Sequence, residues 1–561
     1  MKAFVESAID HQDFLPQDSF QDLITPETIQ RVIESSVGNE GISPKLVEFV
    51  AQKARKLFAI VAITSTEIIP AFESLRQYDF TDENLPISRD TVNDNCDINS
   101  IDRKCSHSLS FNVFHNLPWD RFTITSFYNE QWKFLAPVFA HDRRIQQLPP
   151  KCILPFIEAP QGQDRKSSFF SDVYQVKIHP SHQNVHFPTG DSSTLMTIKE
   201  HRPASEMPDG FGALNFFHRE VQILENLAQF NHNHLVALVS SFSRGERHYL
   251  LFPWADGGNL REFWLDHSSR PLTGELISEV LQQLTGLIDA LCLVHAQQWR
   301  HGDLKPENIL RFTEDDTRLG TLKISDLGQA KHHQNRTNFR SQPTQTRIGT
   351  MAYEAPEAVT SPNEPRSRLY DVWSMGCIFL EFIIWLLDGQ DGLKEFTRDV
   401  TGQGAYFHVN QDTSEARVHD AVQRRLGYCL QHETWTEGTS LGDLSRVVAN
   451  RMLVVSLPQA GSFNNDSESH MDCPSPGESV GDLEMELSAS AEASFIDISA
   501  PSIFSSSLNE NFNIRSDAWT LRECMKHILG RAQEDSEYLF PPQATLVEKV
   551  DELSMRNERM I

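Results

Sequence analysis

The sequence predicts an α+β fold in which a small strand-rich region precedes a larger helical one, with an additional mainly helical domain at the N-terminus. Strand-like runs alternate with one strong helix between Ile153 and Pro253. Beyond residue 254, apolar residues recur mainly at helical spacing. The chain has 561 residues, too many for one compact core, so we expect at least two domains.

Residues 1–150 carry helix-start signals and should form the helical N-terminal domain. Residues 25–27 (Thr-Pro-Glu) combine an N-cap hydroxyl, a first-turn proline and an acid that complements the helix dipole, and residues 43–44 (Ser-Pro) repeat this pattern. Behind the second start, apolar residues at helical spacing predict one apolar face. They are Leu46, Val50, Ala54, Leu57, Phe58 and Val61. Residues 81–102, rich in Asp and Asn, predict a loop.

An aromatic cluster closes this first region, between Phe127 and Phe139. Its members are Phe127, Tyr128, Trp132, Phe134, Leu135 and Phe139. We expect the cluster to pack against the neighbouring domain, because large apolar side chains contribute most when they are buried. A surface on which a ligand stacks is the alternative.

The middle region, residues 153–253, is predicted to contain strands and one helix. Strand-like runs occupy Val173–Ile178, Thr194–Lys199 and Tyr249–Phe252. The helix is expected over Leu214–Leu227, where apolar residues line one face.

The region from residue 254 onward is mainly helical. A clean apolar stripe is formed by Ile277, Leu281, Leu284, Ile288 and Leu291. Asp371–Leu387 is apolar on nearly all sides and is interrupted by Glu381. Its densest apolar run is too short to span a bilayer, so it predicts a helix buried in a large core. Met452–Ile514 contains no Lys or Arg, and the polar, acidic stretch of about 458–510 predicts a disordered insert.

Charge and cysteine usage restrict the partners and the compartment. With 50 Lys and Arg against 77 Asp and Glu, the net charge is −27, which disfavours nucleic acid and anionic membranes as partners. The eight cysteines are scattered without a C-x-x-C pair, and Met1–Phe14 does not resemble a secretory segment. We therefore expect reduced thiols and a cytoplasmic or nuclear location. A Cys96–Cys105 disulfide would require an oxidising compartment.

Three motifs carry the strongest chemical signal. They are residues 300–310 (RHGDLKPENIL), 324–328 (ISDLG) and 355–357 (APE). Taken alone, each charged residue of these motifs would be interpreted as a solvated surface group. In this order and spacing, the set resembles the eukaryotic protein kinase superfamily in its serine/threonine branch, over about residues 153–530.

The resemblance implies a bilobal protein-kinase fold. The N-lobe would span 153–253, the C-lobe 254–540 around the acidic insert, and a C-terminal tail 541–561. The implied reaction transfers the γ-phosphoryl of ATP, bound with Mg²⁺, to serine or threonine hydroxyls of a protein substrate. A small-molecule kinase is disfavoured by residues 355–357 and the long loop before them, which build a peptide-docking surface in protein kinases.

The chemistry of the motif residues fits phosphoryl transfer, which needs alignment and charge neutralisation more than covalent catalysis. Asp303 is suited to orient the substrate hydroxyl or accept its proton. Lys305 can place a cation near the transferred phosphoryl, and the resemblance links it to Ser/Thr substrates. Asn308 and Asp326 offer the oxygen ligands that Mg²⁺ prefers.

Upstream residues match the family's nucleotide site. Lys199, in residues 196–199 (MTIK), would hold the α- and β-phosphates, and Glu220 would fix its ammonium group. By the same resemblance, Phe252 guards the back of the adenine pocket, and backbone groups of residues 253–255, including Trp254 and Ala255, bind the adenine edge. Asp371 is implied to brace the catalytic loop, and Glu357 to pair with a late arginine, for which Arg515 is the candidate.

The glycine-rich loop departs from the family pattern. Alignment on Val173 places Lys166, Ser168 and Ser171 where the family has glycines. Glycine there lets the backbone approach phosphates, although a serine hydroxyl and N–H can both donate to phosphate oxygens. We expect weaker or slower nucleotide use. The alternative is a pseudokinase scaffold that binds partners without turnover.

Gly302 is a second departure, because many relatives have an arginine before the catalytic aspartate. Such an arginine would bind a phosphorylated activation loop through charge-assisted hydrogen bonds. We therefore hypothesise that activity does not depend on phosphorylation of the four candidate sites in that loop. These sites are Thr337, Ser341, Thr344 and Thr346.

The first 150 residues weakly resemble N-terminal helical segments of filamentous-fungal kinases. This resemblance implies no chemistry. The region is expected to be a packed accessory domain, or else a module that binds a regulatory partner.

Overall fold

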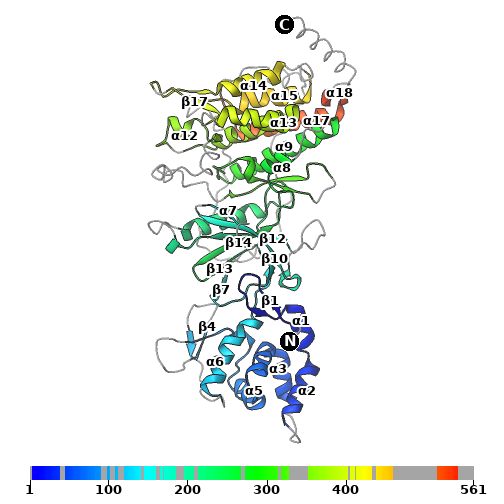
Figure 1. Cartoon of the computed structure of the whole chain (residues 1–561), viewed down its shortest axis with the longest axis vertical. Helices are drawn as coiled ribbons and strands as arrows, with labels where there is room; N and C mark the ends of the chain where they lie inside the picture. The colour runs from blue at the N-terminus through cyan, green and yellow to red at the C-terminus, as the bar shows by residue number, and fades with distance from the viewer. Residues whose placement is uncertain are drawn as a thin grey trace, which may run out of the picture. The chain divides into compact units, whose positions relative to one another are not determined.

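The computed structural model divides the chain into two compact units (Figure 1). The first comprises Met1–Gln229 and Ala237–Trp254, and the second comprises Phe230–Val236 and Ala255–Ile561. The structure describes residues 3–37, 44–89, 98–101, 108–110, 119–140, 145–159, 165–168, 170–184, 195–206, 213–266, 272–313, 317–327, 352–364, 366–401, 405–410, 412–431, 438–458 and 514–540.

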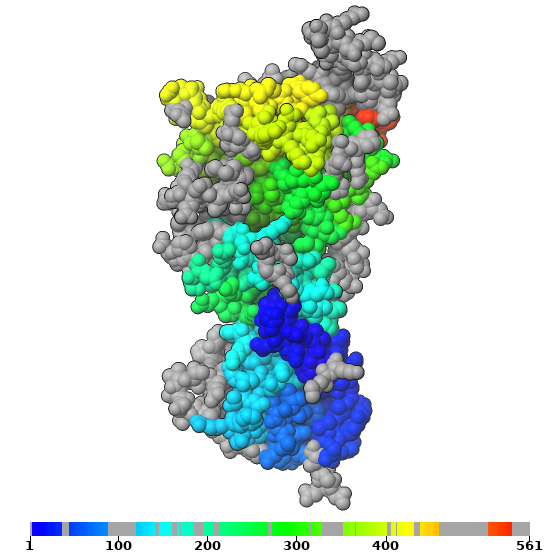
Figure 2. All heavy atoms as spheres, in the orientation of Figure 1, coloured from blue at the N-terminus to red at the C-terminus, as the bar shows by residue number. Residues whose placement is uncertain are grey.

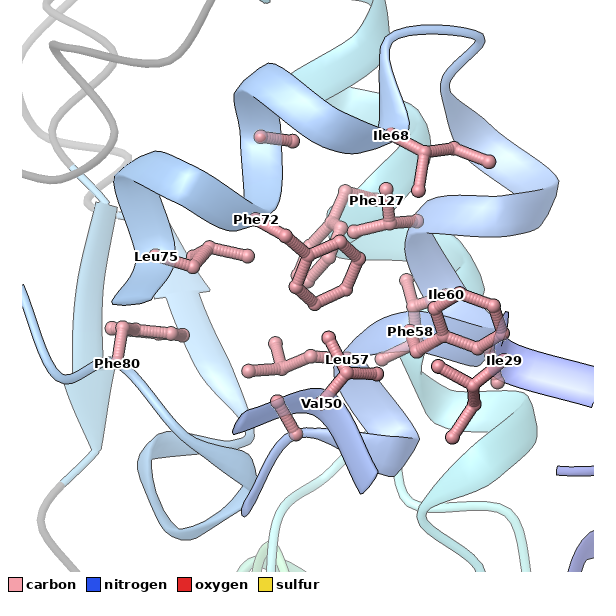
Figure 3. Close-up of a cluster of buried hydrophobic side chains, with 14 of the residues drawn as sticks. Ile29, Val50, Leu57, Phe58, Ile60, Ile68, Phe72, Leu75, Phe80 and Phe127 are labelled. Carbon is pink, nitrogen blue, oxygen red and sulfur yellow. The ribbon is translucent and has the colours of Figure 1, made fainter. Parts of the chain in front are cut away.

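Six helices begin the first unit and confirm its predicted helical character. They are α1 (Gln17–Leu23), α2 (Pro26–Val37), α3 (Pro44–Lys53), α4 (Arg55–Thr64), α5 (Ile68–Gln77) and α6 (Arg121–Glu130). Their buried side chains meet in one cluster, in which Phe58 and Phe72 lie near Phe127 (Figure 3). Short strands β1 (Val5–Glu6) and β2 (Asp13–Phe14) pair with each other.

Two local predictions for this region were wrong in part. The apolar face from Leu46 to Val61 is divided between α3 and α4, because Ala54 leaves the helical conformation (φ −138°, ψ 35°). Asp82 stabilises the new start, since its carboxylate accepts the N–H groups of Lys56 and Leu57, each at 2.9 Å. The predicted loop over 81–102 contains β3 (Ile87–Arg89) and β4 (Ile98–Ile101), which form a sheet with β5 (Ser108–Ser110). Backbone pairing explains these strands despite their polar sequence.

A seven-stranded sheet forms the rest of the first unit. Its path runs β7 (Gln146–Leu148), β13 (Ser240–Arg244), β14 (Arg247–Pro253), β12 (Leu195–His201), β10 (Ser171–Ile178) and β8 (Phe156–Glu158), with β9 (Lys166–Ser167) also paired to β10. Only the β7–β13 pair is parallel among these strands. The predicted helix is present as α7 (Ala213–Ala228).

The N-terminal region is part of the core of this sheet. Phe139 is fully buried, and its ring lies 5.9 Å from Phe156 and 5.1 Å from Phe242. Trp132 packs with Phe14 and Ile153 in a second small cluster. The aromatic prediction is confirmed for Trp132 and Phe139, whereas Phe127 packs within the helical core instead.

Two polar anchors hold the first residues against the rest of the first unit, where Figure 2 shows the dark blue N-terminal segment lying against cyan atoms. Asp10 Oδ1 lies 2.6 Å from an Arg244 nitrogen, and Asp10 Oδ2 accepts the N–H of Leu154 at 2.8 Å. His182 Nε2 accepts the N–H of Gln17 at 3.1 Å, while Nδ1 bonds the Pro137 carbonyl at 2.9 Å. Burial lowers the pKa of His182 to about 4, so the ring is neutral at pH 7.

We expect Phe139→Leu to destabilise the first unit by about 1 kcal/mol, because leucine fills most of the volume but loses the ring contacts. Differential scanning calorimetry would show a lower Tm for one transition. Phe122→Leu is the matched control, since Phe122 is 79% exposed and should be neutral. Equal Tm values for the two variants would contradict the packing role of Phe139.

The second unit is mainly helical. Its helices are α8 (Leu260–Asp266), α9 (Gly274–Ala296), α12 (Glu357–Thr360), α13 (Leu369–Thr401), α14 (Asp420–Gln431), α15 (Ser440–Val447), α17 (Ala518–Glu534) and α18 (Ser536–Leu539). Two hairpins join β15 (Ile309–Phe312) to β16 (Thr321–Ile324), and β17 (Phe407–Val409) to β18 (Ala416–Val418). Together the two units give the predicted bilobal α+β fold.

The central helix was predicted correctly as a buried element. α9 and α13 have the length and composition of membrane spans, but 61% and 89% of their most apolar windows are buried inside the fold. α13 runs beyond the predicted Leu387, and Gly389 (φ 64°, ψ −157°) interrupts its helical backbone.

The predicted insert and tail lie largely outside the described residues, but the junction flanking the insert is visible. Arg515 donates its N–H to the Ser456 carbonyl at 2.9 Å, and Ser516 donates to the Arg451 carbonyl at 2.9 Å. The described residues on the two sides of the insert are therefore adjacent in the second unit.

Candidate active site

The predicted Lys199–Glu220 pair is present in the first unit. Lys199 lies on β12 and Glu220 on α7, with Nζ 2.6 Å from Oε1. The two side chains are only 13% and 4% exposed. Val173 lies directly opposite Lys199 in the β10–β12 register, as expected for a residue of the same site.

The departure at the glycine-rich loop has a specific geometry. Ser168 donates both its N–H and its hydroxyl to the Ser171 carbonyl, at 2.8 and 2.9 Å. Ser171 returns its N–H to Ser168 Oγ at 3.1 Å, and Phe170 packs 4.9 Å from Phe216 of α7. Lys166 pairs with Val173 and is exposed. The donor groups of Ser168 and Ser171 were expected to bond phosphate oxygens. In this conformation, the hydroxyl and N–H of Ser168 and the N–H of Ser171 bond within the turn instead.

We expect the double variant Ser168→Gly, Ser171→Gly to raise kcat/KM for ATP about fivefold, a change comparable to one net hydrogen bond. Glycine removes the hydroxyl bonds that close the turn and lets the backbone approach phosphate. Steady-state kinetics with varied ATP would measure this, with Ser167→Ala on β9 as the control. An unchanged or lower kcat/KM would show that the serine turn does not limit nucleotide use.

The residues predicted to contact adenine, Phe252 to Ala255, lie at the end of β14 and directly after it. Phe252 pairs with Thr197 of β12, and Thr197 Oγ donates to the Pro253 carbonyl at 3.5 Å. Trp254 is the last residue of the first unit, and Ala255 begins the long segment of the second. Their adenine contacts remain predictions.

The catalytic loop of the second unit brings three predicted residues together. Asp303 is buried, and its Oδ2 lies 2.9 Å from Lys305 Nζ. Asn308 donates its amide N–H groups to the Asp303 carbonyl at 2.7 Å and to Oδ2 at 3.2 Å. These bonds fix the Asp303 carboxylate in one orientation, which suits a group that must align a hydroxyl.

Asp371 braces this loop as the resemblance implies. Its carboxylate accepts the N–H groups of His301 and Gly302 at 2.8 Å each, and His295 Nε2 lies 2.8 Å away. Burial raises the pKa of Asp371, but the hydrogen bonds from His295 and the Gly302 backbone, together with the electrostatic effect of the nearby histidines, hold the pKa below its ordinary value. Gly302 has φ 77°, a conformation that strains any residue with a side chain. The four phosphorylation candidates lie outside the described residues.

The two proposed metal ligands flank one end of the β15–β16 hairpin. Ile309 pairs with Ile324, and Ser325 donates its N–H to the Asn308 carbonyl at 2.9 Å. The next residue, Asp326, has φ 58°, an uncommon conformation that is concentrated at functional sites.

The donor set fits Mg²⁺, because its protein sites commonly use one or two oxygen ligands with water and phosphate. The Asn308 amide nitrogen is committed to Asp303, which leaves Oδ1 as its available acceptor. No cluster of three or more His, Cys, Asp or Glu side chains suited to a metal occurs in the described part of the chain.

A polar cluster beside the catalytic loop was not predicted from the sequence. Arg261 of α8 lies 3.1 Å from Glu381 of α13 and 3.3 Å from Glu307. Tyr353 donates its hydroxyl to Glu381 at 2.8 Å. Burial raises the pKa of Glu381 despite these partners. The signal was the isolated acid in an apolar helix, because a buried carboxylate requires polar partners.

The late arginine prediction is confirmed. Arg515 nitrogens lie 2.8 and 3.2 Å from the two Glu357 oxygens, and the arginine side chain is fully buried. This bidentate pair ties the segment after the insert to the start of α12.

Comparisons with known proteins agree with the motifs. The protein kinase domain model matches residues 189–430. Over 200 residues the chain is 31% identical to the serine/threonine-protein kinase RAD53 of Saccharomyces cerevisiae, covering 34% of this chain and 22% of that protein. An Aurora kinase of Yarrowia lipolytica is 35% identical over 167 residues, covering 30% and 39% respectively.

The serine/threonine-protein kinase cds1 of Schizosaccharomyces pombe is 30% identical over 198 residues, covering 35% of this chain and 39% of that protein. The matches thus span less than half the length of these curated relatives. The domain match begins after the serine-containing turn, in keeping with the departure of that turn from the family pattern.

Proposed function

We propose that this chain, whose residues 189–430 match the protein kinase domain, is a serine/threonine protein kinase that transfers the γ-phosphoryl of ATP to serine or threonine hydroxyls of protein substrates. The observation that carries the proposal is the catalytic loop, in which Lys305 and Asn308 hold the buried Asp303 carboxylate. Such a carboxylate can orient the hydroxyl and accept its proton as the phosphoryl leaves ATP.

The other residues take complementary roles. Lys199, held by Glu220, would bind the α- and β-phosphates, with Ser168, Ser171 and Val173 over the nucleotide. Asn308 and Asp326 would hold Mg²⁺, which supplies charge neutralisation at the phosphates. Lys305 would lie beside the transferred group. We further propose a cytoplasmic or nuclear location and a regulatory partner for the N-terminal region.

The test is a pair of measurements on the purified full chain. MgATP should raise Tm, and a serine/threonine peptide library should become phosphorylated, whereas Lys199→Met should lose both responses. A wild-type protein that phosphorylates no peptide and no protein would overturn the proposal.

A pseudokinase scaffold is the second candidate, and the hydrogen-bonded serine turn favours it. It predicts that MgATP raises Tm without turnover. The two measurements therefore distinguish the candidates, because only the kinase gives both responses.

A further inference from the structure

A histidine shares the carboxylate that holds Lys199. His201 follows Lys199 by two positions on β12, so both side chains project from the same face of the sheet toward α7. Glu220 lies between them, with Oε1 2.6 Å from Lys199 Nζ and Oε2 3.2 Å from His201 Nε2. Each oxygen of the Glu220 carboxylate therefore has a basic side chain beside it.

The position of the His201 ring is fixed by packing. His201 is 4% exposed, and its ring meets Phe217 of α7 edge-on at 5.5 Å. His248 of β14 lies directly opposite His201 in the strand register, and its ring stacks on Phe217 with the ring centroids 4.8 Å apart. The imidazole cannot turn far from Glu220 without displacing the buried Phe217 ring.

The buried nitrogen needs an acceptor. His201 Nε2 is off the line of an ideal hydrogen bond to Glu220, and it has no other hydrogen-bond partner among the described residues. A carboxylate oxygen can only accept, so the imidazole must carry its proton on Nε2 to bond it. The 3.2 Å between Nε2 and Glu220 Oε2 is within the range of N–H···O hydrogen-bond lengths, so only the angle of approach departs from a hydrogen bond.

We propose that His201 is a positioning residue, which donates from Nε2 to Glu220 Oε2 and so holds Oε1 toward Lys199. A hydrogen bond at Oε2 restricts rotation of the carboxylate and so keeps Oε1 aligned with the ammonium group. Bound at both oxygens, it presents Lys199 in one orientation to the nucleotide. The inference rests on the proposed function for its catalytic consequence but not for its geometry.

The test compares His201→Leu with His201→Gln in the full chain. Leucine keeps bulk and burial without a donor, whereas the glutamine amide can donate to Glu220 but lacks the ring. We expect His201→Leu to lower kcat/KM for ATP about tenfold or more, and His201→Gln to stay within about threefold of wild type. A role in packing alone would give the opposite order. His218→Gln is the matched control, because His218 is an exposed neighbour on α7.

Hydrogen exchange of α7 without nucleotide provides a readout independent of turnover. His201→Leu should lose amide protection around Glu220, whereas His201→Gln and His218→Gln should keep it. Equal exchange in the leucine and glutamine variants, or faster exchange in glutamine, would overturn the inference. If the wild type shows no phosphoryl transfer, the proposed function fails, while the exchange comparison still decides the role of His201.

Discussion

Replacing Asp303 with asparagine is expected to lower kcat by about a thousandfold, within the range attributed to a positioned general base. Asparagine keeps the shape of the side chain and can still accept from Lys305 and Asn308, which contact the carboxylate at 2.9 and 3.2 Å. It lacks the negative charge that accepts the hydroxyl proton. Single-turnover phosphorylation of a peptide would measure the loss directly.

The Asp303 variant should still bind nucleotide, because Asp303 is not among the proposed ATP ligands. MgATP should raise the Tm of Asp303→Asn as much as that of wild type. Glu364→Gln, an exposed acid of the same unit, serves as the control with unchanged kcat. An asparagine variant that keeps more than about a tenth of the wild-type kcat would exclude Asp303 as the base.

Replacing Arg515 with alanine is expected to destabilise the second unit by about 3–5 kcal/mol, the cost of breaking a buried ion pair by removing one partner. Glu357 would lose both bonds to the guanidinium. The carbonyls of Val454 and Leu369, which accept from Arg515 at 2.8 and 3.1 Å, would lose their donors as well. Calorimetry should show a Tm lower by about 5–10 °C.

Two further variants separate charge from shape at Arg515. Arg515→Lys keeps the charge but cannot bond both Glu357 oxygens in the same way, so an intermediate Tm is expected. Arg318→Ala is the matched control, because its pair with Glu275 is 3.6 Å long and exposed, and such pairs contribute about 0–1 kcal/mol. Similar Tm losses in Arg515→Ala and Arg318→Ala would contradict a structural role for the buried pair.

Sequence reasoning predicted correctly those pairs of residues that belong to motifs with a recognisable order and spacing. Lys199 and Glu220 are far apart in the chain, yet the strand and helix that carry them were recognisable locally. The Glu357–Arg515 pair was found because both partners fit a pattern, although a long insert separates them.

The failures involve contacts that local sequence does not encode. Ala54 breaks an apparently continuous helix because Asp82, well downstream, supplies the cap for the next one. His201 lies beyond the predicted strand Thr194–Lys199, and its contact with Glu220 depends on the cross-strand register and on which face of the sheet α7 covers. The packing of the N-terminal region likewise depends on Phe139 and Asp10, which contact residues about one hundred or more positions away.

The hydrogen bond between Ser456 and Arg515 affects how well insertions and deletions between these two residues should be tolerated. Since hydrogen bonds from Arg515 and Ser516 to the Ser456 and Arg451 carbonyls hold the two flanking segments together, we expect that the number of residues between them can change without moving the helices on either side. Each doubling of the length of such a connecting segment costs only about 0.6 kcal/mol in loop-closure entropy. Related chains should therefore differ widely in size here, and a reporter domain with neighbouring termini could be grafted at this site.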